Sequence, residues 1–377
     1  MIQPQRRDFL KRSTTALVGV SLADSSRFFA GAANDIKVGV ITEPAGTHMS
    51  AYFKSLATCS GIQEVAIAGT KGQNFDKAQE LLGVRGRNLR TFSNYREMLN
   101  TVRPEMVLVS VEAHHAPKLI EAALESGCHV LTEKPPCTRV EDFEPVCQLA
   151  TSKGLHLMVA LATRLNPMAV KARELIEAGT IGKLYGTTMT WIADQTRLKD
   201  PAYHQSWLAS KEKAGGGKLI FHGIHYLDLI EHLTGDRIQE VCGFVRNVGG
   251  QPIAVEDAAV VALHFKGGMV GTLNTGYYLD KGYNNVIRIW GSQGWLSFDL
   301  PAKTPLTWYS TGSGTPKEIQ AYSPANEPDV YGLMVQNAIN ASRGTEKAFM
   351  TPAESLQVMK VVFRAYRSAE TGTAQRV

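Results

Sequence analysis

The sequence has 377 residues, of which 44% are hydrophobic and 20% charged, an ordinary composition for a globular protein with room for two domains. The formal net charge is +5, but five basic and two acidic residues fall within residues 1–32, so the rest of the chain is nearly neutral. A near-neutral body without a long run of lysine and arginine offers no surface to a phosphate backbone, which excludes a nucleic-acid-binding protein.

Residues 1–33 are predicted to form a signal peptide. Residues 5–11, with Arg6 and Arg7, resemble the twin-arginine export signature, and a short apolar stretch and a run of small residues follow. The apolar stretch is too short to stay in a bilayer as a spanning helix, and no later segment is long enough, so we expect no membrane span. Because twin-arginine export carries folded proteins, we expect a periplasmic or otherwise extracytoplasmic protein. The alternative is an ordinary basic, frayed N-terminus.

Residues 34–160 alternate buried β-branched runs with amphipathic segments. Repeated strand–helix units of this length predict a Rossmann-like domain, a doubly wound parallel sheet with right-handed crossovers. The expected strands lie at 36–41, 64–68, 105–110, 129–132 and 155–159. The expected helices lie at 49–58, 76–82, 116–126 and 141–153.

The pattern changes in residues 161–350, for which we predict an α+β domain that serves the substrate and oligomerisation. A helix is expected at 167–178, and alternating runs separated by glycine-containing turns predict an open, mainly antiparallel sheet. Its expected strands lie at 186–193, 241–248, 258–265, 269–277, 285–291 and 294–298. In the last segment, 351–377, a helix at 354–370 is expected to pack back against the first domain.

Ligands of a doubly wound sheet bind at the carboxyl ends of its strands. The loop after the first strand reads TEPAGTH from Thr42 to His48, where a dinucleotide fingerprint would read GxGxxG. Only Gly46 remains to let the backbone approach a pyrophosphate, and Glu43 would repel one. The sequence of this loop alone therefore does not decide whether the domain binds a dinucleotide.

The second strand ends without the acid that binds ribose hydroxyls in NAD sites. Thr70 and Lys71 stand there instead, which favours the 2′-phosphate of NADP. The alternative for this position is a solvated turn.

Glu133, Lys134 and Pro135 follow another strand of the first domain. A lysine at a buried strand end has a lowered pKa and can share a proton with a substrate hydroxyl. As a bare tripeptide, however, this sequence is also common in surface turns.

Residues 215–228 read GGGKLIFHGIHYLD and open a helix. His222 and His225, three residues apart, share a face, and a histidine near its natural pKa can exchange protons at neutral pH. With Asp228 the set could suggest a metal, but no further ligand cluster follows, so we predict none. Helix-capping or core histidines are the other reading.

Taken in order, four segments resemble the glucose–fructose oxidoreductase/inositol dehydrogenase/MocA (Gfo/Idh/MocA) family. They are GCHVLTEKP at 127–135, RLNP at 164–167, IEAGTIGK at 176–183 and the glycine triplet that leads to His225. The resemblance covers roughly residues 36–370. It implies tightly bound NADP or NAD in the first domain, a sugar or polyol over the open face of the second domain's sheet, and a homo-oligomer.

The resemblance also implies roles for individual residues. Lys134 and His225, with His222 beside them, would be catalytic. Contacts to the cofactor are expected from Thr42, Gly46, Thr47, His48, Thr70, Lys71, Ser110, Glu112, Glu133, Lys134 and Arg164. Contacts to the substrate are expected from Lys134, Tyr203, His204, Trp207, His222 and His225.

Two departures from the family pattern leave three functions to weigh. Phe221 stands where the family often has an aspartate, four residues before the histidine, and the glycine loop is eroded. The leading hypothesis is an NAD(P)-dependent oxidoreductase that acts on a carbohydrate or polyol hydroxyl. The second is a glycoside-cleaving enzyme that oxidises its substrate transiently, and the third is a cofactor-less sugar-binding or scaffold protein.

Overall fold

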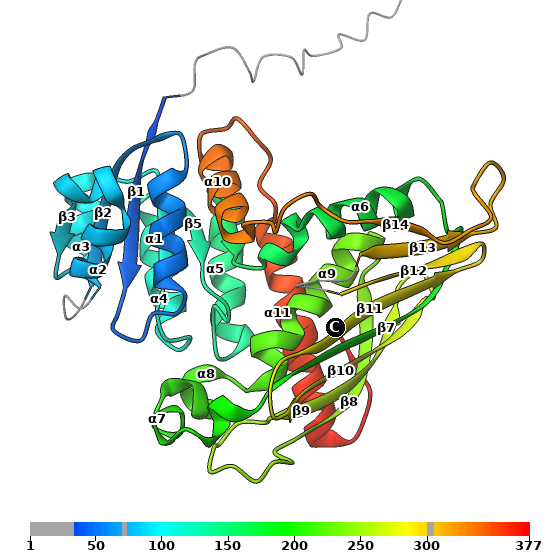
Figure 1. Cartoon of the computed structure of the whole chain (residues 1–377). Helices are drawn as coiled ribbons and strands as arrows, with labels where there is room; N and C mark the ends of the chain where they lie inside the picture. The colour runs from blue at the N-terminus through cyan, green and yellow to red at the C-terminus, as the bar shows by residue number, and fades with distance from the viewer. Residues whose placement is uncertain (1–33, 70–73, 300–304) are drawn as a thin grey trace, which may run out of the picture. The chain divides into compact units, whose positions relative to one another are not determined.

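The computed structural model describes residues 34–69, 74–299 and 305–377. The predicted signal peptide, as well as Thr70 and Lys71, therefore lies outside the described residues. Residues 33–377 form one compact unit that contains two sheets, labelled in Figure 1. Among the described helices, none combines the length and the apolar character that crossing a bilayer requires.

The first sheet has six parallel strands in the order β3-β2-β1-β4-β5-β6, which confirms the doubly wound prediction. Its strands are β1 (Ile36–Thr42), β2 (Ile62–Gly69), β3 (Arg90–Phe92), β4 (Met106–Ser110), β5 (His129–Thr132) and β6 (Leu157–Val159). The helices that follow them are α1 (Met49–Thr58), α2 (Phe75–Leu81), α3 (Tyr95–Val102), α4 (Ala116–Glu125) and α5 (Val140–Ser152). Strand β4 is buried along its whole length, as its unbroken apolar run predicts for a parallel sheet covered on both faces. The strand order reverses between β1 and β4, so their carboxyl ends open a crevice there.

The second sheet has nine strands in the order β14-β13-β12-β11-β7-β10-β9-β8-β15. Its strands are β7 (Leu184–Asp194), β8 (Ile238–Arg246), β9 (Ala258–Phe265), β10 (Val270–Leu279), β11 (Asn284–Gly291), β12 (Gly294–Phe298), β13 (Leu306–Ser310), β14 (Gln320–Tyr322) and β15 (Gln375–Arg376). All neighbouring pairs are antiparallel except β7 with β10, which confirms the mainly antiparallel prediction.

Helices cover one face of this sheet (Figure 1). They are α6 (Pro167–Glu177), α9 (Ile224–Thr234) and α11 (Pro352–Thr371), while α10 (Val330–Ser342) packs on α1 of the first domain. Helix α11 begins with a capping box between Thr351 and Glu354. It contacts both domains, since Ser355 donates a hydrogen bond to the carbonyl of Leu157 and the α11 backbone packs along β8.

Candidate active site

The loop from β1 to α1 is held tightly against the end of β4. A Cβ atom at Gly46 would lie 2.5 Å from Thr42 Oγ1 and 2.6 Å from the carbonyl oxygen of Ser110, so only glycine fits there. The Ser110 hydroxyl donates a hydrogen bond of 2.9 Å to the carbonyl of Thr47. The one glycine kept from the fingerprint thus lets the loop approach the neighbouring strand.

The Glu43 carboxylate is turned toward the segment after β4. It accepts a hydrogen bond from the backbone N–H of Glu112, and its second oxygen lies 3.0 Å from His115 Nδ1. Protein partners thus occupy both oxygens of the group that would otherwise repel a phosphate.

A cavity of about 290 Å³ opens at the carboxyl ends of β1, β2 and β4, where the strand order predicts nucleotide binding. Its lining residues are Ile41, Thr42, Glu43, Ala68, Gly69, Ser93, Tyr95, Val111, His114, His115, Lys118 and Leu119. The apolar and aromatic walls suit a flat base, and the hydroxyls and basic groups suit ribose and phosphate. The residues present therefore fit a dinucleotide, in spite of the eroded fingerprint.

Glu133 is a buried anchor at the end of β5. Its carboxylate lies 2.7 Å from His48 Nδ1 and accepts hydrogen bonds from the Tyr52 hydroxyl at 2.9 Å and the Lys134 backbone N–H at 2.8 Å. Burial opposes its ionisation, but these hydrogen bonds and the charge of Lys134 outweigh burial and lower the pKa of Glu133. The α1 loop is tied in this way to the strand that carries Lys134.

Lys134 enters the space between the two sheets. Its Nζ donates a hydrogen bond of 3.1 Å to the carbonyl of Phe221 and lies 5.3 Å from the centre of that ring. Burial lowers the pKa of Lys134 in spite of the charge of Glu133, and the charge of Arg197 lowers it further.

His222 and His225 both face this space. They lie on a π-helical turn, Leu219–Gly223, and on the first turn of α9. Tyr277 Oη is 3.2 Å from His222 Nδ1, whereas the buried His225 Nδ1 has no hydrogen-bond partner among the described residues. Burial, followed by the charges of nearby lysines, lowers both histidine pKa values well below 6.5, so both rings are neutral at pH 7.

Trp191 on β7 and Tyr277 on β10 form the floor beneath the histidines. The Trp191 ring lies 5.3 Å from the His222 ring and 5.4 Å from the His225 ring. Since alternate residues of a strand share a face, Trp191 points to the same side as the buried Met189, which is the helix-covered side. The resemblance implied a sugar over the open face of the sheet, and the site residues instead gather on the covered face.

Lys218 was missed in the sequence reasoning, although it directly follows the glycine triplet. It is fully buried, and its Nζ has no hydrogen-bond partner among the described residues. The Nζ lies 4.4 Å from the centre of the Tyr277 ring and 5.7 Å from that of Trp191. Burial, with the charges of Arg197 and Lys134, lowers the pKa of Lys218 to about 6. A lysine at the start of an otherwise apolar helical segment was the available signal.

The three predicted substrate residues of the segment after β7 differ in their surroundings. Trp207 Nε1 donates a hydrogen bond of 3.3 Å to the carbonyl of Ala45, and its ring lies 5.7 Å from that of Phe221, so it joins the α1 loop to the site. Tyr203 lies under the guanidinium of Arg197, 4.9 Å away. His204 contacts the carbonyl of Leu198 within its own segment.

Arg164 forms a buried ion pair with Asp228. Two hydrogen bonds of 2.8 and 2.7 Å join the guanidinium to the Asp228 carboxylate, and a third of 2.9 Å reaches Glu354. Burial opposes the charged form, but both carboxylates outweigh it and raise the pKa of Arg164. These contacts favour a structural role over the predicted contact with the cofactor, and they give Asp228 a partner other than the histidines.

One cluster in the described part of the chain has the geometry of a possible metal site. Glu112, His114 and His115 offer ligand atoms within 4.8 Å of one another beside the cavity, and two of the three side chains are exposed. No second feature of the structure points to a metal there, and the prediction of a site without metal stays a prediction.

Two features together are typical of a nucleotide-dependent oxidoreductase. One is the crevice where the strand order of the parallel sheet reverses, and the other is the buried set of side chains that can exchange protons. Two family models match the chain: "Oxidoreductase family, NAD-binding Rossmann fold" over residues 33–161, and "GFO/IDH/MocA C-terminal domain" over residues 169–297. The chain belongs to the Gfo/Idh/MocA family of oxidoreductases, as its motifs predicted, and it is an enzyme of that type.

Known relatives support the same placement. The chain is 25% identical over 344 residues to the D-glucoside 3-dehydrogenase of Escherichia coli, covering 86% of this chain and 92% of the relative. It is 24% identical to the myo-inositol 2-dehydrogenase of Thermotoga maritima, covering 63% and 68%. A levoglucosan dehydrogenase in complex with NADH and L-sorbose shares the fold, with a TM-score of 0.80, 19% identity and coverage of 91% and 98%.

Proposed function

We propose that this enzyme transfers a hydride between NAD(P) and a carbon that bears a hydroxyl of a carbohydrate or polyol. The activities of the two relatives, on a D-glucoside and on myo-inositol, support this class of substrate. A buried, neutral histidine nitrogen without a partner, beside a lysine of lowered pKa, carries the proposal. A site that oxidises an alcohol must accept a proton while the carbon loses its hydride.

His225 and Lys134 divide this proton handling. The neutral His225 ring accepts the proton of the reacting hydroxyl, and the Lys134 ammonium donates a hydrogen bond to the same oxygen. Bound in the crevice, the nicotinamide supplies the hydride acceptor. His222 and Trp191 pack beside His225 and keep bulk water from it, and Tyr203 and Trp207 offer aromatic surfaces to a sugar ring.

The experiment compares Lys134→Met and His225→Gln with the full chain on a panel of sugars and polyols, by following NAD(P)H absorbance. We expect each variant to lose at least about a hundredfold in kcat, since general acid–base groups contribute about 10²–10⁴. The nucleotide affinity of His225→Gln should stay within about threefold. Lys153→Met is the control, because this exposed lysine follows α5 and donates a hydrogen bond to the carbonyl of Glu125. Full activity in both variants would contradict the assigned roles.

The enzyme must also hold its cofactor after export. We infer tightly held NADP or NAD, because an exported enzyme could not recycle free cofactor, and the sequence Thr70-Lys71 supports NADP. Denaturing the purified protein and identifying the released nucleotide by mass spectrometry tests this inference. About one equivalent of nucleotide is expected; none, with no uptake on addition, would contradict it.

A second candidate is glycoside cleavage by transient oxidation, favoured by the relative that acts on D-glucosides. In this route the cofactor ends unchanged, so a nitrophenyl glucoside would release nitrophenol without net formation of NAD(P)H. Release that stays at the background rate would leave the simple oxidoreductase.

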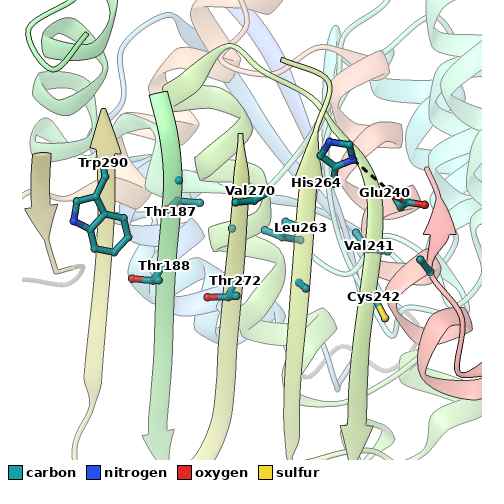
Figure 2. A pocket seen from close by; sticks show the side chains of 14 residues that line it. Thr187, Thr188, Glu240, Val241, Cys242, Leu263, His264, Val270, Thr272 and Trp290 are labelled. Atoms are coloured by element: carbon teal, nitrogen blue, oxygen red, sulfur yellow. Dashed lines mark ion pairs between the residues drawn. The ribbon is translucent and has the colours of Figure 1, made fainter. Parts of the chain in front are cut away.

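We also propose a homo-oligomer that pairs through the open face of the second sheet. Figure 2 shows this face, on which a hollow of about 540 Å³ extends from β11 across β7, β10 and β9 to β8. Apolar side chains such as Leu263, Val270 and Trp290 line it together with threonines and the ion pair of His264 with Glu240. Phe244, Val260, Val270 and Trp290 are exposed there. Val270→Lys should shift the protein to monomer in sedimentation velocity, whereas Val84→Lys, at an exposed valine of the first domain, should not.

Export by the twin-arginine route is the last part of the proposal and rests on the order of basic, apolar and small residues at 1–33. Replacing Arg6 and Arg7 by lysine should retain the protein in the cytoplasm of a host that exports the original chain.

A further inference from the structure

Three cationic side chains meet at the substrate end of the site. Lys218 is fully buried, Lys134 lies beside Phe221, and Arg197 stands at the exposed rim over the rings of Tyr203 and Tyr277. The charges of Arg197 and Lys134 act on Lys218, so the three are close enough to repel one another. None of them forms an ion pair with a side-chain carboxylate in the described part of the chain.

Two buried carboxylates whose charges act on this cationic cluster or on its aromatic rings already have partners. Glu133 is held by His48 and Tyr52. Glu256 accepts hydrogen bonds from the backbone N–H groups of Gly217 and Leu219 and from the Tyr366 hydroxyl, at 2.7 to 2.8 Å. The cationic cluster therefore keeps an excess of positive charge among buried aromatic rings.

A buried amine without an acceptor is costly, and proteins retain such a group where a ligand satisfies it. We propose that Lys218 and Arg197 form an anion subsite, and that the substrate is a sugar acid whose carboxylate they receive. This inference rests on the proposed function, because the same substrate presents its hydroxyl to His225. A planar carboxylate matches the guanidinium fork of Arg197, and one negative charge with two lone-pair edges fits two donors.

Other positively charged or titratable groups also face Lys218. His222 and Tyr277 lie against it from the π-helical turn and from β10, and the Trp191 ring faces it from β7. Both His222 and Tyr277 are neutral at pH 7, since burial lowers the pKa of the first and raises that of the second. The carboxylate of the ligand therefore finds the Arg197 guanidinium and the Lys218 amine as its partners, and the amine takes up a proton when the carboxylate binds.

The test is isothermal titration calorimetry on the full chain, with its nucleotide present, against three matched pairs of an aldose and its uronate: glucose, galactose and mannose. For at least one pair we expect the uronate to bind ten times more tightly or better. Lys218→Met, of similar length, should bring the two members of that pair within about twofold while nucleotide affinity is unchanged. Lys199→Gln, at an exposed lysine of the same short 3-10 turn as Arg197, should keep the preference.

Several results would overturn the inference. They are a uronate that binds no better than its aldose in every pair, the absence of binding by all three uronates, and a preference that survives in Lys218→Met. If glucose 6-phosphate binds more tightly than every uronate, the subsite takes phosphate and the carboxylate assignment falls. Should Lys218→Met not fold, Arg197→Gln at the rim gives the second measurement, with the same loss of preference expected.

Proton uptake provides an independent readout. Because the pKa of Lys218 is about 6, most of the amine is neutral at pH 7.5, and a bound carboxylate should raise that pKa and draw in close to one proton. Titrations in two buffers of different ionisation enthalpy measure this uptake, which should disappear in Lys218→Met. Equal uptake in both proteins would contradict the role of Lys218.

These binding measurements need no turnover, so the two proposals can fail separately. Preferential uronate binding without formation of NAD(P)H would retain the anion subsite and overturn the proposed function. Turnover of neutral sugars without a binding preference for uronates would retain the proposed function and overturn the anion subsite.

Discussion

The buried ion pair between Arg164 and Asp228 should be a main determinant of the stability of the second domain. Replacement of Asp228 by asparagine keeps the size of the side chain but leaves a buried guanidinium with one charged partner, Glu354. The amide can accept only one of the two present hydrogen bonds, and its NH2 group then meets the N–H groups of the arginine. Removing one partner of a buried pair costs about 3–5 kcal/mol, and we expect a loss near the lower end because Glu354 remains.

Guanidinium unfolding followed by circular dichroism measures this cost. The matched control is Lys171→Gln, which breaks the exposed pair with Glu174 and should change the free energy of unfolding by less than about 1 kcal/mol. A loss in Asp228→Asn as small as that of the control would refute the argument, because it would mean that water or another donor compensates the pair. A loss of nucleotide affinity without a loss of stability would instead restore the predicted contact between Arg164 and the cofactor.

Two further predictions concern the cofactor loop and acid stability. Gly46→Ala should weaken nucleotide binding at least about tenfold in fluorescence titration, because its Cβ would lie 2.6 Å from the Ser110 carbonyl oxygen and push the loop away; unchanged affinity would show that the loop does not contact the nucleotide. Glu354→Gln should flatten the pH dependence of stability between about pH 4.5 and 2. Burial opposes the ionisation of Glu354, but the charge of Arg164 outweighs burial and lowers the pKa of Glu354 to about 2. The ionised carboxylate therefore contributes its full stabilisation above pH 4.5, and this stabilisation is lost as the pH falls toward 2. Parallel curves for the two proteins in this interval would contradict that linkage.

The sequence predicted the architecture where a strand is a buried apolar run or is bounded by a hairpin turn. Buried β-branched runs predicted β1, β4 and β5, and hairpin turns predicted β9 to β12. The short strands β3, β13 and β14 were not predicted, because they are partly exposed and, unlike the equally short β5 and β6, carry no unbroken buried apolar run. The parallel pairing of β7 with β10 could not be predicted either, since 75 residues separate the two strands along the chain and only the folded sheet brings them together.

The sequence predicted the site in part. Lys134, His222 and His225 were singled out because motifs and helical spacing mark them, and the structure brings them together. Trp191 and Tyr277 were not, because an aromatic residue on a strand is ordinarily core and only its partner across the sheet reveals a role. Lys218 is likewise buried against rings from two strands that are distant in the sequence, so a local sequence pattern cannot predict its burial.

Phe221 affects both the pKa of Lys134 and the net charge of the site. Phe221 offers Lys134 a carbonyl and a ring but no negative charge, where the family pattern often places an aspartate. Phe221→Asp would put a carboxylate about 5 Å from the lysine amine, which should raise the pKa of Lys134. The ammonium form would then persist to higher pH, so the alkaline limb of the kcat/KM profile should move upward and the preference for uronates should shrink.

Phe221→Asn separates this charge effect from the loss of the ring, since it removes the packing against Trp207 without adding a charge. If Phe221→Asn shifts the alkaline limb as far as Phe221→Asp does, packing sets the pKa of Lys134 and the argument from charge fails. If only Phe221→Asp shifts it, the missing carboxylate leaves the site positively charged, and an acidic substrate brings the compensating charge that the protein no longer supplies.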